Sequence, residues 1–277
     1  MKFVKMHGLG NDFVVVESPC WDNADLLQKH ARSLCNRNFG IGADGVLVIG
    51  KDTEADIFMR IFNSDGSEAE MCGNGIRCAA RYAFERNLIK HNKLMVRTLA
   101  GIRCPEILCA GDNIKAVKVD MGEPVLDCSL IPMKCDHGNI KVKVTAAGRD
   151  FVITGVSMGN PHCVVLVDSI DQVPVQLWGP QLENHEIFPA RSNVEFVQVI
   201  NRNEVVLRVW ERGAGVTLAC GTGACAGLVA CVLNGVTERE AVVHLTGGDL
   251  LVSWNESDNH VYMTGPAEEV FSGDIAL

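Results

Sequence analysis

The sequence predicts a mixed α/β fold, of the α+β kind, made of two pseudo-symmetric halves related by internal duplication. Three observations predict it. The motif Cys-Gly-x-Gly occurs twice, at Cys72 and at Cys220. Short β-rich stretches precede each copy, and a run of helical composition follows each copy. At 277 residues, the chain is long enough for two domains of ordinary size.

The repeat extends beyond the two motifs, because landmarks in the two halves are separated by the same 148 to 149 residues. That period is far too long for a solenoid and indicates a duplicated domain. We therefore predict an N-terminal half at residues 1–119 and a C-terminal half at residues 120–277, with the last strand free to return to the first half. The paired landmarks are Asn11 and Asn160, Asn63 and Glu211, and Cys72 and Cys220.

Alternating apolar residues and β-branched side chains predict the strands of both halves. In the first half the predicted strands are Phe3–Met6, Asp12–Glu17, Val46–Ile49 and Asp56–Phe62. In the second half they are Lys141–Val144, Phe151–Val156, His162–Val167, Val194–Ile200, Val205–Trp210, Val242–Leu245, Leu250–Trp254 and Val261–Met263.

Two predicted helices begin directly after the motif cysteines. Residues Gly75–Asn87 mix apolar and charged side chains, whereas Gly223–Leu233 is apolar throughout. A helix that is apolar all round must be buried on all sides, so we expect a sheet curled around it. A further helix is predicted at about residues Ala24–Cys35.

Each motif places its cysteine at a predicted helix N-terminus. The first N–H groups of a helix have no internal partner and lie at the positive end of its dipole, so they attract a carboxylate. The same position favours a thiolate, which predicts a pKa below the usual value of about 8.5 for Cys72 and Cys220. Each thiol then suits acid–base chemistry near neutral pH.

Two such thiols match the needs of an epimerase. Inverting a carbon requires one group to remove a proton from one face and a second group to deliver a proton to the other. We expect Cys72 and Cys220 to serve the two faces, one as thiolate and one as thiol. The helix ends would stabilise the carbanion by stabilising the charge that is delocalised into the carboxylate.

Six longer motifs resemble those of the diaminopimelate epimerase family over nearly the whole chain. The motifs are His7-Gly8-Leu9-Gly10-Asn11-Asp12-Phe13, Asn63-Ser64-Asp65-Gly66-Ser67, Met71-Cys72-Gly73-Asn74-Gly75, Gly159-Asn160-Pro161-His162, Glu211-Arg212-Gly213-Ala214-Gly215 and Ala219-Cys220-Gly221-Thr222-Gly223. The resemblance implies interconversion of LL- and meso-diaminopimelate, in lysine and peptidoglycan-precursor synthesis, without pyridoxal phosphate or metal. It also implies that each half is a barrel-like, mostly antiparallel sheet around a central helix, usually in a homodimer.

The resemblance also assigns roles to single residues. Cys72 and Cys220 become the proton-transfer pair, with His162 and Glu211 beside them. The distal carboxylate of the substrate is expected on Arg212, whose guanidinium suits bidentate pairing. The other expected substrate-binding residues are Asn11, Asn63, Gly73, Asn74, Asn160, Asn193, Gly221 and Thr222.

The sequence departs from the family pattern at two positions and leaves alternatives open. Some members have Gln in place of Gly45, and many have Glu in place of Val216. A proline racemase would have His in place of Asn74, and the phenazine-type isomerases lack the cysteine pair. The remaining alternatives are a redox sensor with a Cys72–Cys220 disulfide and an amino-acid-binding protein without catalysis.

Composition excludes several classes of function. The formal net charge of −9 and the pI near 5.4 argue against nucleic-acid binding. No apolar run approaches the roughly 20 residues of a membrane span, and the first ten residues lack the apolar core of a secretory signal. We therefore expect a cytoplasmic protein that binds a small molecule and neither nucleic acid nor membrane.

The twelve cysteines include no Cys-x-x-Cys pair, which argues against a zinc knuckle or a thioredoxin-type dithiol. Cys128, Cys135 and His137 have a loose spacing for a metal corner, and we expect no metal there. Apart from Cys72 and Cys220, we expect most cysteines to be buried small hydrophobic residues.

Overall fold

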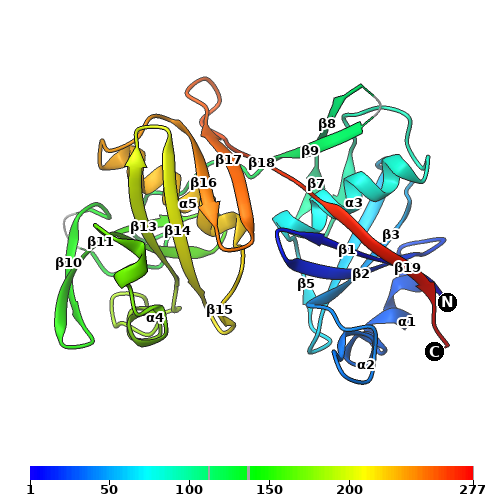
Figure 1. Ribbon diagram of the computed structural model, residues 1–277, viewed down its shortest axis with the longest axis horizontal. Helices are drawn as coiled ribbons and strands as arrows, with labels where there is room; N and C mark the ends of the chain where they lie inside the picture. Colours follow the sequence, from blue (N-terminus) through cyan, green and yellow to red (C-terminus); the bar gives the residue numbers. More distant parts are fainter. Residues whose placement is uncertain (112, 136–137, 277) are drawn as a thin grey trace. The chain divides into compact units, whose positions relative to one another are not determined.

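The computed structural model describes residues 1–111, 113–135 and 138–276 (Figure 1). The chain divides into two compact units. Unit 1 contains Met1–Asp120 together with Thr264–Leu277, and unit 2 contains Met121–Met263. The chain thus enters unit 1, passes through unit 2, and returns its last strand to unit 1.

Unit 1 is a mostly antiparallel sheet with strand order β19-β1-β2-β3-β4-β6-β7, and β5 pairs with β4. The β2–β3 and β4–β6 pairs are parallel. Unit 1 also contains an antiparallel hairpin, β8–β9. The bounds are β1 (Lys2–Gly8), β2 (Asn11–Glu17), β3 (Gly45–Lys51), β4 (Ile57–Asn63), β5 (Glu68–Ala69), β6 (Val96–Thr98), β7 (Gly101–Arg103), β8 (Glu106–Ala110), β9 (Asn113–Asp120) and β19 (Glu268–Asp274).

The central strands of unit 1 are buried on both faces. Helix α3 (Gly73–Glu85) contacts strands β1 to β4 and the β8–β9 hairpin. The opposite face of the sheet packs against η1 (Asp22–Ala24), α1 (Asp25–Gln28) and α2 (Ala31–Cys35). Double coverage explains why β3 is a continuous apolar run rather than an alternating one.

Unit 2 has the strand order β10-β11-β12-β13-β14-β16-β17-β18, and β15 pairs with β14. The β12–β13 and β14–β16 pairs are parallel, as at the corresponding places of unit 1. The bounds are β10 (Val142–Ala146), β11 (Arg149–Ser157), β12 (Pro161–Leu166), β13 (Asn193–Asn201), β14 (Glu204–Glu211), β15 (Gly215–Val216), β16 (Glu240–Leu245), β17 (Gly248–Trp254) and β18 (Val261–Gly265).

The sheet of unit 2 encloses helix α5 (Gly221–Leu233), which contacts strands β11, β12, β13, β14, β16 and β17 (Figure 1). Residues 224–231 of this helix are all buried. Outside the sheet lie η2 (Ile170–Gln172) and α4 (Val175–Glu183), which packs on β13 and β14. The apolar composition of α5 therefore follows from contact with the sheet on all sides.

The predicted fold class is confirmed, because both units repeat the same strand directions around a central helix. The predicted helix at Ala24–Cys35 is wrong as one element, since it breaks into η1, α1 and α2. Packing of a short amphipathic segment, rather than helix propensity, decides its conformation. Helix α4, with Pro180 inside it, and strands β6 to β9 and β19 were absent from the prediction.

Candidate active site

Both motif cysteines are the N-cap residues of a helix. Cys72 has an extended backbone before α3, and Cys220 has an extended backbone before α5. In each case the sulfur accepts a hydrogen bond from a backbone N–H, that of Gly75 or Gly223, at 3.4 Å. A sulfur atom thus takes the place of the oxygen of a Ser or Asp cap.

The second glycine of each motif is closely packed. A methyl group on Gly75 would lie 3.2 Å from Cδ2 of Leu47. A methyl group on Gly223 would lie 2.8 Å from Oε1 of Glu195 and 3.2 Å from the sulfur of Cys220. The Cys-Gly-x-Gly pattern therefore lets each helix begin directly against the sheet.

In unit 1, an amide cluster surrounds Cys72. Its sulfur donates to Oδ1 of Asn11 at 3.7 Å, and the amide of Asn74 donates to the same oxygen at 3.1 Å. The buried guanidinium of Arg77 donates to the carbonyl of Gly73 at 3.1 Å and to Oδ1 of Asn74 at 2.9 Å. Arg77, which the sequence analysis did not single out, therefore fixes the first turn of α3.

Asn11 is held in turn by a group of charged residues. Its amide donates to Oδ2 of Asp44 at 2.8 Å. Arg37 bridges Asp44 and Asp12, and Lys5 pairs with Asp12 at 2.6 Å. Burial alone would raise the pKa of Asp12, but the hydrogen bonds and charges of Arg37 and Lys5 lower it to about 2.

The predicted residue Asn63 lies at the end of β4, where its amide donates to Oγ of Ser67 at 2.9 Å. Its backbone pairs with Gly45 across the β3–β4 ladder. A side chain at Gly45 would approach the carbonyl oxygen of Phe62 at 2.9 Å with the backbone as it stands here.

In unit 2, polar side chains form a continuous chain of contacts that ends at Cys220. Oγ1 of Thr222 lies 3.5 Å from the sulfur, and the amide of Asn160 donates to Thr222 at 3.5 Å. Oδ1 of Asn160 lies 3.0 Å from Nε2 of His162. Nδ1 of His162 lies 2.7 Å from Oε1 of Glu195, and both of these side chains are fully buried.

Glu211 is the second carboxylate beside Cys220. It accepts a hydrogen bond from Thr217 at 2.5 Å and another from the thiol of Cys220. Burial raises the pKa of Glu211 despite these two hydrogen bonds. A carboxylate of raised pKa that touches a thiol is suited to exchange a proton with it.

The predicted lowering of the Cys220 pKa is wrong. Burial raises the pKa of this thiol well above its usual range, and the charges of Glu211 and Glu195 raise it further. Hydrogen bonds from Thr222 and Gly223 oppose the increase and are outweighed by it. Desolvation and neighbouring carboxylates thus dominate over the helix N-terminus.

Asn193 and Arg212 lie together near the ends of β13 and β14. Oδ1 of Asn193 accepts from the backbone N–H of Arg212 at 2.9 Å, and its amide donates to the carbonyl of Pro161 at 3.1 Å. The exposed Arg212 side chain donates to the carbonyl of Ala190 at 3.0 Å. Asn193 therefore holds the backbone from which Arg212 projects.

The structure brings most of the predicted residues together within each unit. Cys72, Gly73, Asn74 and Asn11 form one group in unit 1. The group around Cys220 in unit 2 also contains Glu195, which was not predicted from the sequence. An acidic residue within the apolar run Val194–Val197 was the available signal, because a carboxylate in a buried strand requires a partner.

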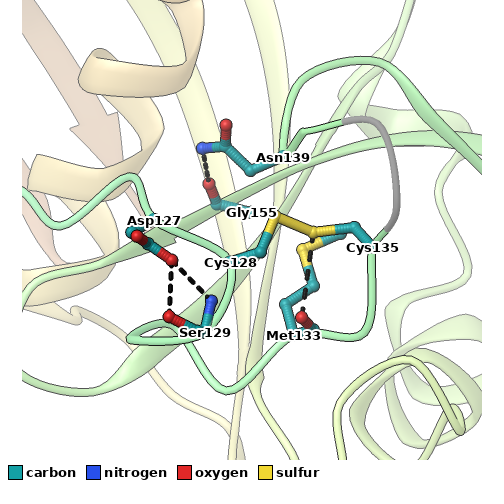
Figure 2. The surroundings of a disulfide bond; sticks show 7 residues. All are labelled: Asp127, Cys128, Ser129, Met133, Cys135, Asn139 and Gly155. Atoms are coloured by element: carbon teal, nitrogen blue, oxygen red, sulfur yellow. Dashed lines mark hydrogen bonds between the residues drawn. A yellow bond between two sulfur atoms is a disulfide. The ribbon is translucent and has the colours of Figure 1, made fainter.

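The remaining cysteines differ from the expectation in part. Cys128 and Cys135 form a disulfide bond (Figure 2), so they are not a pair of metal-binding thiols. His137, the third residue of the loose metal grouping, lies outside the described residues. Cys72 and Cys220 are not part of a disulfide. The expected burial is confirmed for Cys35, Cys78, Cys163, Cys225 and Cys231 and is wrong for the exposed Cys20, Cys104 and Cys109.

Within the described part of the chain, no three His, Cys, Asp or Glu side chains are grouped so as to hold a metal ion. None of the described helices has the length and apolar character needed to cross a membrane.

Comparison with known sequences identifies close relatives. Residues 3–126 and 154–270 match a family model described as Diaminopimelate epimerase. The diaminopimelate epimerase of Acetivibrio thermocellus is 52% identical over 279 residues, covering 100% of this chain and 99% of the relative. The diaminopimelate epimerase of Heliobacterium modesticaldum is 53% identical over 282 residues, covering 100% of both chains.

Comparison with solved structures identifies the same fold at low sequence identity. A PhzF-family phenazine biosynthesis protein of Bacillus anthracis has a TM-score of 0.71 at 17% identity, covering 100% of this chain and 99% of that one. A hydroxyproline epimerase of Agrobacterium vitis has a TM-score of 0.69 at 17% identity, covering 99% and 91%. These likenesses concern the fold alone.

Proposed function

Because the chain belongs to the diaminopimelate epimerase family and epimerises diaminopimelate, we propose that Cys72 and Cys220 are the two acid–base groups of that reaction. The enzyme is thus an isomerase. Its reaction breaks the α-C–H bond on one face, forms a new C–H bond on the opposite face and leaves every other bond of the substrate in place.

The observation that carries the proposal is the duplicated cap. A cysteine outside any disulfide stands at the N-terminus of the central helix in each unit, and its sulfur accepts a hydrogen bond from the backbone N–H of the residue three positions later. An α-carbon has two faces, and inversion requires one group for each. In our mechanism a thiolate removes the α-proton and the other thiol delivers its own proton to the opposite face. The two cysteines exchange roles in the reverse direction.

The carbanion requires electrostatic stabilisation, because the α-proton of an amino acid is very weakly acidic. We propose that the N–H groups of Gly73, Asn74, Gly221 and Thr222 bind the adjacent carboxylate. These groups belong to the first turns of α3 and α5, where N–H groups lack intrahelical partners. Charge that moves into the carboxylate during the reaction is then met by preorganised donors.

Glu211 and His162 assist Cys220 in this proposal. Glu211 accepts the hydrogen bond of the thiol, and its raised pKa brings its affinity for a proton closer to that of the thiol. Such matching favours transfer between them. Burial and two carboxylates raise the pKa of Cys220, so a substrate or a neighbouring base must help to generate its thiolate.

The second amino-acid head group of diaminopimelate needs its own site. We propose Arg212 for the distal carboxylate, since its guanidinium is exposed and projects from the backbone held by Asn193. Asn11, Asn63, Asn160 and Asn193 supply amide groups for the substrate ammonium and carboxylate groups. Three of these four lie at strand ends: Asn11 in β2, Asn63 in β4 and Asn193 in β13.

Removal of each thiol tests the proposal. Cys72→Ala and Cys220→Ala should both abolish epimerisation, by at least the 10²- to 10⁴-fold typical of a general acid or base. A variant with one remaining thiol should still exchange the α-proton with deuterated solvent for one stereoisomer only, and the other variant should favour the opposite isomer. Cys104→Ala, which removes an exposed cysteine outside the group, is the control. Near wild-type epimerisation by either motif variant would overturn the two-thiol mechanism.

We further propose that the enzyme is a homodimer. Strand β19 forms one edge of the unit 1 sheet, and Val270 and Phe271 on it are 55% and 48% exposed. Exposed apolar edge strands pair readily with a second chain. Sedimentation equilibrium should give a dimer for the wild type and a monomer for Phe271→Glu. A monomeric wild type would contradict the proposal.

We place the enzyme in the cytoplasm. A two-thiol mechanism requires Cys72 and Cys220 to remain reduced, and reducing compartments provide that condition; in such a compartment we expect the Cys128–Cys135 disulfide to be reduced as well. Fractionation of cells producing the protein checks this placement.

A further inference from the structure

We propose that Glu195 is a positioning residue for the epimerase, which acts through His162 to hold Asn160 and Thr222 against Cys220. The inference rests on the proposed role of Cys220. It adds a buried carboxylate that touches neither sulfur nor substrate in the mechanism and yet sets the orientation of the groups that do.

The contacts between Glu195 and Cys220 form an unbroken chain. From Oε1 of Glu195 to Nδ1 of His162 the distance is 2.7 Å, and from Nε2 of His162 to Oδ1 of Asn160 it is 3.0 Å. The amide of Asn160 then reaches Thr222, whose hydroxyl reaches Cys220. Glu195 is thus the far end of a chain of four hydrogen-bonded contacts.

The hydrogen bonds that lead from His162 to Cys220 have a defined direction. Asn160 presents its oxygen to His162, so Nε2 of His162 carries a hydrogen and donates it. This orientation turns the Asn160 amide group toward Thr222, whose oxygen accepts it. The Thr222 hydroxyl hydrogen is then free to point at the sulfur of Cys220. From Nε2 of His162 onward the donors therefore face the cysteine, so the chain fixes the orientation of the groups that contact its sulfur.

The position in unit 1 that corresponds to Glu195 is occupied by an apolar residue. Leu47 and Glu195 are separated by the repeat offset, and each approaches the second glycine of its own motif, Gly75 or Gly223. His162 pairs with Asn193 in unit 2 as Phe13 pairs with Gly45 in unit 1. In unit 1 the places of Glu195 and His162 are taken by the apolar residues Leu47 and Phe13, and the local fold is the same. The fold therefore does not require a carboxylate at residue 195.

The buried carboxylate of Glu195 lowers the stability of the fold. Glu195 is fully buried, and its Oε2 has no hydrogen-bond partner among the residues that the structure describes. A buried acceptor without a donor destabilises a protein relative to an apolar side chain of similar shape. A role in stability alone would be better served by Leu, as at Leu47.

Steady-state kinetics on two variants test the inference. Glu195→Leu should lower kcat for diaminopimelate about 10- to 100-fold, because His162 and Asn160 lose their fixed orientation. Its melting temperature should be equal to or above that of the wild type. Glu195→Gln, whose amide can still hydrogen bond Nδ1 of His162, should keep most of the activity. Glu195→Met is a second apolar replacement if Leu prevents folding.

A control and a double-mutant cycle make the result specific. Glu204→Gln removes the carboxylate of the surface pair with His244 in the same unit and should leave kcat unchanged. In a His162→Ala background, Glu195→Leu should cost little further activity, because Glu195 acts through the missing imidazole. An equal loss in both backgrounds, or a Gln variant as inactive as the Leu variant, would overturn the positioning role.

The same data separate this inference from the proposed function. If Cys220→Ala stays active, the two-thiol mechanism fails. If Cys220→Ala is inactive while Glu195→Leu keeps wild-type kcat, the mechanism stands and the role of Glu195 fails.

Discussion

Gly223 and Glu195 are in such close approach that a methyl group on Gly223 would lie 2.8 Å from the carboxylate oxygen. The oxygen has little freedom to retreat, because the same atom is bonded to His162 at 2.7 Å. At the matching place in unit 1, the neighbour of Gly75 is a methyl group of Leu47 at 3.2 Å. The two glycines of the repeat thus face neighbours of different chemistry.

This difference predicts unequal effects of one substitution. Gly223→Ala should destabilise the protein by about 1–3 kcal/mol and lower kcat, because it displaces Glu195 or the start of α5. Gly75→Ala should be milder, since an apolar side-chain end can shift by a few tenths of an ångström. Urea unfolding and kcat measured on both variants check the order. Equal losses in the two variants would contradict it.

Asp12 makes the stability of unit 1 sensitive to acid. Its pKa of about 2 in the folded protein is below the unfolded value of about 3.9. The ionised carboxylate therefore stabilises the fold above about pH 4, and this contribution is lost as the pH falls toward 2. Asp12→Asn should be less stable than the wild type at pH 6, and the difference should narrow by pH 3. Urea midpoints across this range measure it, and a constant difference would count against the assignment.

Local chemistry explains which parts of the fold and site could be predicted from the sequence. The turns at Cys72 and Cys220 are short-range features, because the capping cysteine, the glycines and the start of the helix all lie within four residues. Strands such as β13 and β14 were predicted because their apolar patterns are strong. The resemblance assigned Asn11 and Cys72 to the same site, and the two side chains are in contact in the structure.

Long-range pairing explains what could not be predicted. The Glu195–His162 bond depends on the parallel register of β12 and β13, which no local pattern encodes. The raised pKa of Cys220 follows from complete burial beside two carboxylates, whereas the sequence indicated only the helix N-terminus. Strand β19 pairs with β1 across almost the full length of the chain, and its exposed residues give little periodic signal.

The Cys128–Cys135 disulfide should stabilise unit 2 when it is formed. Closing a loop of this length corresponds to about 2–3 kcal/mol in the chain-entropy model. Cys135→Ser should therefore unfold at lower urea concentration than the oxidised wild type and should match the wild type treated with dithiothreitol. Cys109→Ser, at an exposed free cysteine, is the control. A wild type indifferent to dithiothreitol would show that the bond adds no stability.

Arg212 should decide whether the enzyme tells diaminopimelate from lysine, which lacks the distal carboxylate. The side chain is exposed, and the backbone from which it projects is held by a hydrogen bond from the N–H of Arg212 to Oδ1 of Asn193. For a charge pair that the bound substrate buries, loss of one hydrogen-bonded partner costs roughly 2–5 kcal/mol. At about 1.4 kcal/mol per tenfold, kcat/KM for diaminopimelate should fall by roughly 30- to 3000-fold in Arg212→Met. Wild-type kcat/KM for lysine should already be lower than that for diaminopimelate by a similar factor.

The two substrates and a second arginine separate recognition from a general loss of structure. Lysine turnover, where measurable, should change little in Arg212→Met, because lysine makes no contact that the substitution removes. Arg208→Met, four residues earlier on β14, should leave both substrates unaffected. Arg212→Lys should recover part of the loss, since an ammonium keeps the charge but not the bidentate geometry. Equal kcat/KM for lysine and diaminopimelate in the wild type would rule out this role for Arg212.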